Sequence, residues 1–141
     1  MGLYKFINLN IYEPKIRAKG IKMFNFLSGG NAGKPVSAAD AVAAVTSGEM
    51  VVIDCREAGE LQASGTAKGG VHIPLALLAL KADPKAPDHD KRLDPAKPVA
   101  IFCASGGRSG MGAQVLTRLG YQEHNIGGFG DWVSAGGAVQ R

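Results

Sequence analysis

Candidate β-strands and helices alternate along the chain from residue 35 to the C-terminus. Candidate strands lie at 50–53, 71–75, 99–103 and 121–126. Segments of helical character lie between them. This alternation predicts an α/β fold, in which a small parallel sheet carries helices on both faces.

Capping residues mark the ends of the predicted helices. Ser37 is a good N-cap with Asp40 at the third helical position, and Gly48 ends the helix that follows. Gly120 is placed to end the longest helix. The expected helices lie at 38–45, 76–81 and 109–119 and from 131 onward, and a turn is expected at 127–130.

Two stretches have the composition of loops. The segment 82–98 contains four prolines and many charges, so it is predicted to be an exposed loop with at most one helical turn. Residues 28–33 are rich in glycine and have the composition of a flexible linker. We therefore predict an N-terminal extension and linker at 1–34 and a folded domain at 35–141.

The positive charge of the chain is concentrated near its N-terminus. The formal net charge is +4 at pH 7. Residues 1–22 hold five basic residues and one acidic residue, which leaves 11 of each sign in the rest of the chain. The predicted domain is therefore neutral, and no basic face for binding nucleic acid is expected.

Length and cysteine content limit the remaining classes of protein. The 141 residues suffice for one domain with a substantial core. No apolar run has the length of a membrane helix, and no secretory leader is recognised. Two cysteines cannot form a disulfide framework. We expect a cytoplasmic protein with no membrane partner.

Cys103 ends the apolar strand at 99–103 and begins a loop of small residues. Gly106 and Gly107 have no side chain to hold the backbone away from the sulfur. The N–H groups of the loop and of the next helix converge on Cys103, and Arg108 is placed to add positive charge. Together they favour a thiolate, so Cys103 is predicted to be a nucleophile rather than a small buried apolar residue.

Three stretches in order resemble the motifs of the rhodanese sulfurtransferases. Residues 103–109, Cys-Ala-Ser-Gly-Gly-Arg-Ser, resemble the active-site loop of that family. Residues 52–57 resemble its first motif and residues 65–75 its second. The similarity covers roughly residues 36–140 and implies the three-layer α/β/α fold of the family.

The resemblance implies a sulfurtransferase that works by a ping-pong cycle through a persulfide on Cys103. Sulfane sulfur comes from thiosulfate or a persulfide donor. It passes to a thiophilic acceptor, which is cyanide in an assay and a thiol or an acceptor protein in a cell. No cofactor is implied. Arg108 is expected to fix the loop and to favour the anionic sulfur. The expected sulfur-binding loop comprises Ala104, Ser105, Gly106, Gly107 and Ser109.

Other polar residues of the motifs are expected to support the site. Asp54 is expected to cap neighbouring backbone, and Arg56 to form an ion pair. Thr66 stands where many family members have histidine, so a hydrogen bond near the second motif is expected to be absent. The three histidines show no ligand spacing, so no metal site is expected.

Three alternatives stay open beside sulfur transfer. In the first alternative, the domain is a sulfur carrier or an interaction module with little turnover. Alternatively, Cys55, where the family often has an aliphatic residue, forms a thiol-redox switch with Cys103 instead of packing as a half-buried residue. A phosphatase is the third alternative, but phosphatases of this kind use a Cys-x5-Arg loop, whereas four residues separate Cys103 from Arg108.

Overall fold

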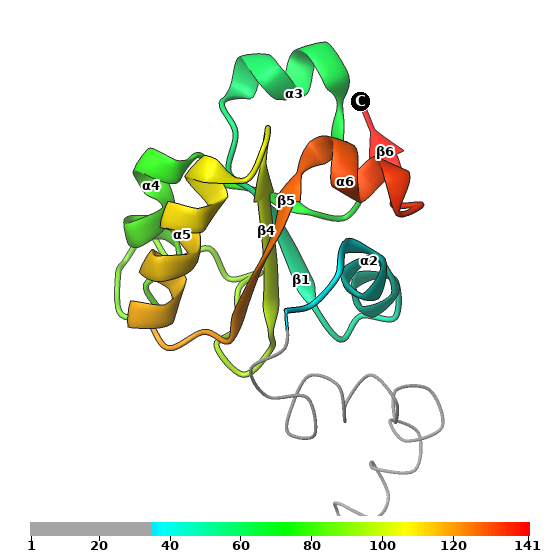
Figure 1. Cartoon of the computed structure of the whole chain (residues 1–141). Helices are drawn as coiled ribbons and strands as arrows, with labels where there is room; N and C mark the ends of the chain where they lie inside the picture. The colour runs from blue at the N-terminus through cyan, green and yellow to red at the C-terminus, as the bar shows by residue number, and fades with distance from the viewer. Residues whose placement is uncertain (1–34) are drawn as a thin grey trace, which may run out of the picture. The chain divides into compact units, whose positions relative to one another are not determined.

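The computed structural model describes residues 35–141 (Figure 1). The predicted extension and linker at 1–34 lie outside the described residues. The helices are α2 (Ala38–Thr46), α3 (Ala58–Ser64), α4 (Leu75–Lys81), α5 (Gly107–Arg118) and α6 (Phe129–Ser134). The strands are β1 (Val51–Asp54), β2 (Thr66–Ala67), β3 (Val71–His72), β4 (Val99–Cys103), β5 (Glu123–Gly128) and β6 (Val139–Gln140).

Four strands form a parallel sheet in the order β3-β1-β4-β5. Strand β4 lies inside this sheet, and all of its residues are buried. The predicted α/β fold with a parallel sheet is therefore confirmed. Because all four strands run in one direction, their carboxyl ends meet at one edge of the sheet, where ligands of such folds bind.

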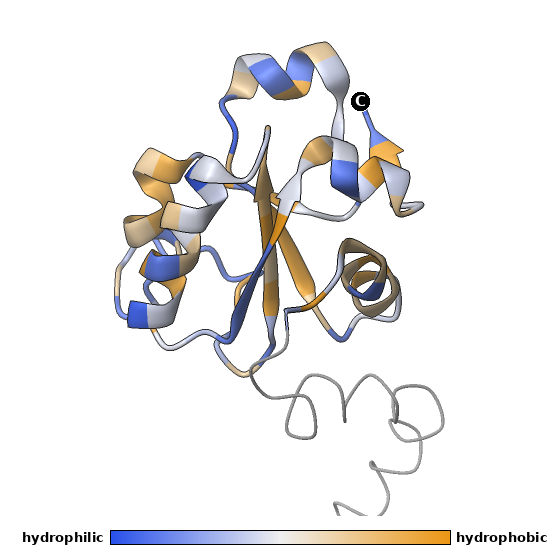
Figure 2. Ribbon diagram, in the orientation of Figure 1, coloured by the Kyte–Doolittle hydropathy of each residue, from blue (hydrophilic) through white to orange (hydrophobic). Residues whose placement is uncertain are grey.

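Different helices cover the two faces of the sheet. Helices α4 and α5 lie on one face, and α2 and α6 on the other (Figure 1). On the first face, Ile101 of β4 packs in one cluster with Leu78 of α4 and Leu116 of α5. On the other face, Phe102 stacks on Trp132 of α6 with ring centroids 6.3 Å apart. Apolar residues accordingly dominate the central strands (Figure 2).

The predicted start of α2 is confirmed. The side chain of Ser37 accepts a hydrogen bond from the Asp40 N–H at 3.0 Å and also donates to its carboxylate. Gly48 follows the helix with a φ of +83°, a left-handed conformation that favours glycine. The capping residues thus place α2 within one residue of the prediction.

The turn predicted at 127–130 is wrong. Gly127 and Gly128 complete β5, and Phe129 and Gly130 begin α6. A side chain at Gly128 would collide with the backbone carbonyl of Ala104, so this glycine serves close packing rather than a turn. The strand predicted at 121–126 therefore lies two residues further along the chain, because it continues through Gly127 and Gly128.

Smaller differences from the prediction concern strand β3, the segment 82–98 and a second, two-stranded sheet. The strand predicted at 71–75 is limited to β3, because Pro74 is the N-cap of α4. The segment 82–98 has no helix or strand, as predicted, but Leu93 within it is buried in the core. Strands β2 and β6 form a two-stranded antiparallel sheet that the sequence did not reveal.

Among residues 35–141, no helix is both long enough and apolar enough to cross a bilayer.

Candidate active site

Cys103 lies at the carboxyl end of β4 and is only 1% exposed. The chain then turns sharply, and α5 begins at Gly107. Gly106 makes this turn with a φ of +106°, a left-handed conformation that L residues with a side chain rarely adopt. The loop and the first turn of α5 therefore wrap around the sulfur of Cys103.

Hydrogen-bond donors surround this sulfur. The Gly106 N–H donates to Cys103 Sγ at 3.0 Å, and the Ser109 hydroxyl lies 3.4 Å from the same atom. Burial raises the pKa of the Cys103 thiol. The hydrogen bonds from the Ser109 side chain and from the N–H groups of Ser109, Ser105 and Gly106 outweigh this effect and lower the pKa from 9.0 to about 7. This lowered pKa makes the thiolate available near neutral pH.

Asn125 of β5 holds this loop from the side of the sheet. Its Nδ2 donates to the carbonyl of Gly106 at 3.1 Å, and its Oδ1 accepts from Ser109 Oγ at 2.8 Å. The N–H of Gly127 donates to the same Oδ1 at 3.0 Å. Asn125 thus links both donors of the Cys103 sulfur, the Gly106 N–H and the Ser109 hydroxyl, to the neighbouring strand.

Arg108 forms a two-pronged ion pair with Glu60 of α3. Its two terminal nitrogens donate to the two carboxylate oxygens of Glu60 at 2.8 and 2.9 Å. This hydrogen bonding lowers the pKa of Glu60 to about 2 and raises the pKa of Arg108 above its ordinary value. The negative charge of Cys103 also favours the protonated guanidinium. Arg108 therefore ties α5 to α3, and Glu60 offsets much of the charge that Arg108 offers to the sulfur.

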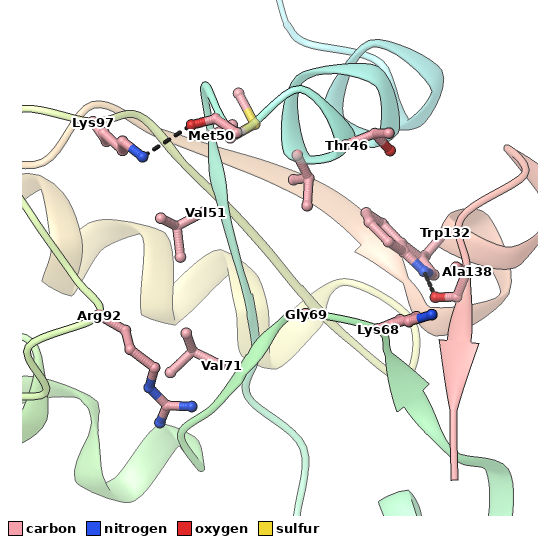
Figure 3. A pocket seen from close by; sticks show the side chains of 12 residues that line it. Thr46, Met50, Val51, Lys68, Gly69, Val71, Arg92, Lys97, Trp132 and Ala138 are labelled. Carbon is pink, nitrogen blue, oxygen red and sulfur yellow. Dashed lines mark hydrogen bonds between the residues drawn. The ribbon is translucent and has the colours of Figure 1, made fainter.

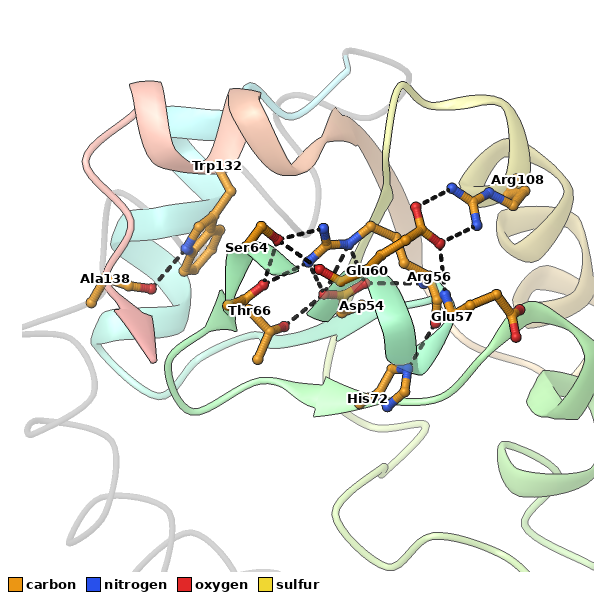
Figure 4. A network of polar contacts seen from close by, with 11 residues as sticks. Asp54, Arg56, Glu57, Glu60, Ser64, Thr66, His72, Arg108, Trp132 and Ala138 are labelled. Carbon is orange, nitrogen blue, oxygen red and sulfur yellow. Dashed lines mark hydrogen bonds and ion pairs between the residues drawn. The ribbon is translucent and has the colours of Figure 1, made fainter. Parts of the chain in front are cut away.

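Asp54 and Arg56 form a buried ion pair behind the loop (Figure 4). Their side chains are 1% and 5% exposed. Arg56 also donates to Ser64 Oγ at 3.0 Å and to the Gly65 carbonyl at 2.9 Å, and its guanidinium lies 4.4 Å from the centre of the Phe129 ring. Asp54 accepts from the N–H of Arg56, so the expected backbone capping is confirmed. This pair joins β1 to α3, β2 and α6.

The expectation of a missing hydrogen bond at Thr66 is wrong. Thr66 Oγ1 donates to Asp54 Oδ2 at 2.6 Å. The shorter threonine side chain reaches Asp54 because β2 runs close to the end of β1 (Figure 4). This position therefore holds the buried carboxylate without a histidine.

Cys55 lies beside Cys103 at the end of the neighbouring strand. It is fully buried, and both cysteines are free thiols. Burial raises the pKa of the Cys55 thiol to about 12, and the charge of Cys103 acts in the same direction. The two neighbouring thiols therefore differ strongly in acidity, and only Cys103 is a thiolate near neutral pH.

Two residues of this site escaped the sequence analysis. Glu60 and Asn125 are polar residues outside the three motifs, and neither is buried. Glu60 lies 48 residues from Arg108 along the chain, and Asn125 lies 16 residues from Ser109. A local signal for Glu60 does exist, because its side chain accepts from the Glu57 N–H at the start of α3.

A separate hollow of about 440 Å³ is lined by Val51 and Val71 at the starts of β1 and β3 and by Trp132 of α6 (Figure 3). Met50 and Trp132 contribute to its apolar lining, and Lys68, Arg92 and Lys97 contribute positive charge. No residue of the Cys103 loop lines it. The size of this hollow therefore does not mark the reactive centre. The hydrogen bonds around Cys103 do.

No group of three or more His, Cys, Asp or Glu residues within 35–141 is arranged to hold a metal ion. Instead, His72 Nε2 lies 2.7 Å from the carbonyl of Arg56, within hydrogen-bonding distance.

Comparison with protein families identifies the class of domain. The family described as Rhodanese-like domain matches residues 37–135. The chain belongs to this family. A search of curated proteins finds no match to the chain.

Solved structures with the same fold include several relatives of similar length. A protein of unknown function from Rhodopseudomonas palustris, described as a possible tyrosine phosphatase, is 29% identical with a TM-score of 0.66, and the match covers 79% of this chain and 87% of that one. A rhodanese-related protein from Thermoplasma volcanium is 29% identical with a TM-score of 0.60, over 76% and 97% of the two chains. An uncharacterized protein from Saccharomyces cerevisiae is 27% identical with a TM-score of 0.56, over 73% and 92%.

Proposed function

We propose that this protein is a sulfurtransferase that carries sulfane sulfur as a persulfide on Cys103. The observation that carries the proposal is the set of donors around Cys103 Sγ, namely the Gly106 N–H at 3.0 Å and the Ser109 hydroxyl at 3.4 Å. Such a cradle stabilises an anionic sulfur. Membership of the rhodanese-like family supports the same chemistry.

The first half of the cycle loads the sulfur. The Cys103 thiolate attacks the outer sulfur of thiosulfate, and a new S–S bond forms as the bond within thiosulfate breaks. The electron pair of that bond leaves with sulfite. A persulfide donor reacts in the same way and leaves as a thiol. Because the nucleophile is already a thiolate and the group that leaves is sulfite or a thiolate, this step needs no general acid or base.

The loop residues hold the loaded sulfur in this mechanism. The terminal sulfur of Cys103–S–S⁻ takes the place of the thiolate as the acceptor of the loop N–H groups from Ala104 to Ser109. The positive end of the α5 dipole favours the same negative charge. Arg108 positions this loop through Glu60, while Asp54 and Arg56 hold the scaffold behind it.

The second half of the cycle discharges the sulfur to an acceptor. A thiophilic acceptor attacks the terminal sulfur and frees the Cys103 thiolate. Ala104, Ser105 and Gly107 are exposed, so the mouth of the loop is open. The acceptor is a small thiol or the thiol of an acceptor protein.

The geometry of Arg108 argues against phosphate-ester hydrolysis, the activity suggested for the Rhodopseudomonas palustris relative. A phosphatase of the Cys-x5-Arg type needs its arginine to bind phosphate oxygens. Here both terminal nitrogens of Arg108 are bound to Glu60, and the loop between Cys103 and Arg108 has only four residues. A smaller cradle suits one sulfur atom better than a phosphate.

Intact mass after incubation with thiosulfate, and again after cyanide, tests the proposal. We expect the chain to gain one sulfur atom and to lose it as thiocyanate forms. Cys103→Ser should abolish the gain, whereas Cys55→Val, the matched control on the neighbouring strand, should retain it. A persulfide that cyanide cannot discharge would favour a carrier, and a fully active Cys103→Ser protein would refute the mechanism.

A further inference from the structure

Two cysteines occupy neighbouring positions at the carboxyl ends of paired strands. Strands β1 and β4 are aligned with Ile53 opposite Ile101 and Asp54 opposite Phe102. The next step of this register brings Cys55 opposite Cys103. The Cys55 N–H donates to the carbonyl of Phe102 at 3.0 Å, so the strand alignment continues to this position.

Both thiols lie on the same face of the sheet. Side chains alternate along a strand, so Cys55 shares the face of Ile53, and Cys103 shares the face of Ile101. All four belong to one buried cluster. Neighbouring strands lie about 4.8 Å apart, which is within the range of Cα separations that a disulfide spans. The Cα atoms of Cys55 and Cys103 are therefore at a separation that a disulfide can bridge.

We propose that Cys55 is a second reactive thiol, which displaces sulfide from a persulfide on Cys103 and closes a Cys55–Cys103 disulfide. The inference rests on the proposed persulfide. The sulfur of Cys55 attacks Sγ of Cys103, and the bond from Sγ to the outer sulfur breaks. The electron pair leaves with the outer sulfur, which takes the proton of Cys55 and departs as HS⁻. The persulfide is already at the oxidation level of a disulfide, so no external oxidant is needed.

The surroundings of the two sulfurs favour this direction of attack. The loop N–H groups hold the outer sulfur on the side of α5, whereas Cys55 approaches Sγ from the neighbouring strand. Cys55 is fully buried, so external thiols and disulfides do not reach its sulfur. The high pKa of Cys55, about 12, slows the attack near neutral pH. An acceptor at the open loop therefore takes the sulfur first, and Cys55 releases as sulfide only what no acceptor collects.

The experiment uses the full chain loaded in two ways. One sample is loaded with thiosulfate and the other with inorganic polysulfide, which delivers a persulfide without the proposed transfer reaction. After removal of excess donor, released HS⁻ is measured over time. Intact mass after alkylation without reductant separates the persulfide from the disulfide. The disulfide form lacks both thiol hydrogens and takes up no alkylating reagent at either cysteine.

Cys55→Val is the matched control, because valine keeps the buried position apolar. In the wild type we expect the persulfide to convert to the disulfide with release of one HS⁻ per chain. In Cys55→Val the persulfide should persist and no disulfide should form. Cys55→Ala provides the same test should valine disturb folding, as judged by thermal unfolding.

The outcomes separate this inference from the proposed function. A persulfide that persists in the wild type, with Cys55 still free, overturns the role of Cys55 and leaves sulfur transfer intact. Loading by polysulfide but not by thiosulfate refutes thiosulfate as donor, and the same polysulfide sample still decides whether Cys55 closes the disulfide. Sulfide release that is equally fast in Cys55→Val also overturns the inference.

Discussion

At the scale of single residues, one hydroxyl hydrogen, that of Ser109, contributes to the acidity of Cys103 beside the backbone N–H groups. Ser109 Oγ carries a single hydrogen, and three acceptors surround it: Asn125 Oδ1 at 2.8 Å, Cys103 Sγ at 3.4 Å and the Gly127 carbonyl at 3.4 Å. The sulfur becomes the stronger acceptor when it is ionised. Ser109 is fully buried, so water does not substitute for this donor.

We expect Ser109→Ala to raise the pKa of Cys103 by about one pH unit, which corresponds to the loss of one hydrogen bond to a charged group. The rate of Cys103 alkylation against pH measures this value, which lies at about 7 in the wild type. Ser105→Ala is the control, because Ser105 lowers this pKa through its backbone N–H. Equal profiles for Ser109→Ala and the wild type would contradict the role of the hydroxyl.

Residues of the candidate site differ in how visible they are in the sequence. Cys103 and its loop are contiguous, so their order alone indicated a turn around the sulfur. Glu60 and Asn125 reach the loop from α3 and β5. Only the packing of these elements brings them to Arg108 and Ser109. An exposed asparagine has no pattern that distinguishes it from an ordinary surface residue. The capping signal of Glu60 indicates the start of a helix, but not a contact with Arg108.

At the scale of helices and strands, the Asp54–Arg56 pair joins four elements, and its removal should be costly. Arg56→Ala leaves the carboxylate of Asp54 buried without its partner, so we expect a loss of about 3–5 kcal/mol in the free energy of unfolding. Arg92→Ala is the control, because Arg92 pairs with Asp90 at the surface and is 63% exposed. Its loss should cost less than about 1 kcal/mol. Urea unfolding measures both, and similar losses would refute the structural role of Arg56.

The approach of β5 to the Cys103 loop gives a second prediction for this scale. A side chain at Gly128 would overlap the backbone of Ala104, and no rotamer change relieves a clash with backbone. We expect Gly128→Ala to displace the loop and to lower both stability and Cys103 reactivity. Gly130→Ala, two residues along in α6, meets open space and should be neutral or slightly stabilising. Thermal unfolding and the rate of Cys103 alkylation are measured for both variants. Equal values for Gly128→Ala and Gly130→Ala would contradict the prediction.

Elements with strong local signals could be predicted, and those defined by distant contacts could not. Helix α2 has its N-cap and strand β4 its apolar run within a few residues, so both were placed within one residue. Strand β2 has two residues and exists only because it pairs with β6, about 70 positions away. The glycines at 127 and 128 indicated a turn, but they serve other purposes. Gly127 adopts a left-handed φ of +96°, and Gly128 allows β5 to pack against the backbone of the loop.

At the scale of the whole domain, the parallel sheet brings the site together. Strands β1 and β4 end side by side, so the motif after β1 and the loop after β4 meet at one edge. Helix α3 lies beyond this edge and supplies Glu60, while β5 supplies Asn125 (Figure 1). Every residue assigned to the site therefore comes from residues 35–141.

This arrangement predicts that a chain of residues 35–141 folds and reacts by itself. Its core, its buried ion pair and the donors around Cys103 all come from these residues. We expect such a fragment to unfold cooperatively, to show the same pH profile of Cys103 alkylation and to take up sulfur from thiosulfate as the full chain does. A fragment that folds but loses sulfur uptake would show that residues 1–34 contribute to donor binding. A fragment that does not fold would refute the predicted domain boundary at residue 35, since the core described here would then be insufficient without the preceding segment.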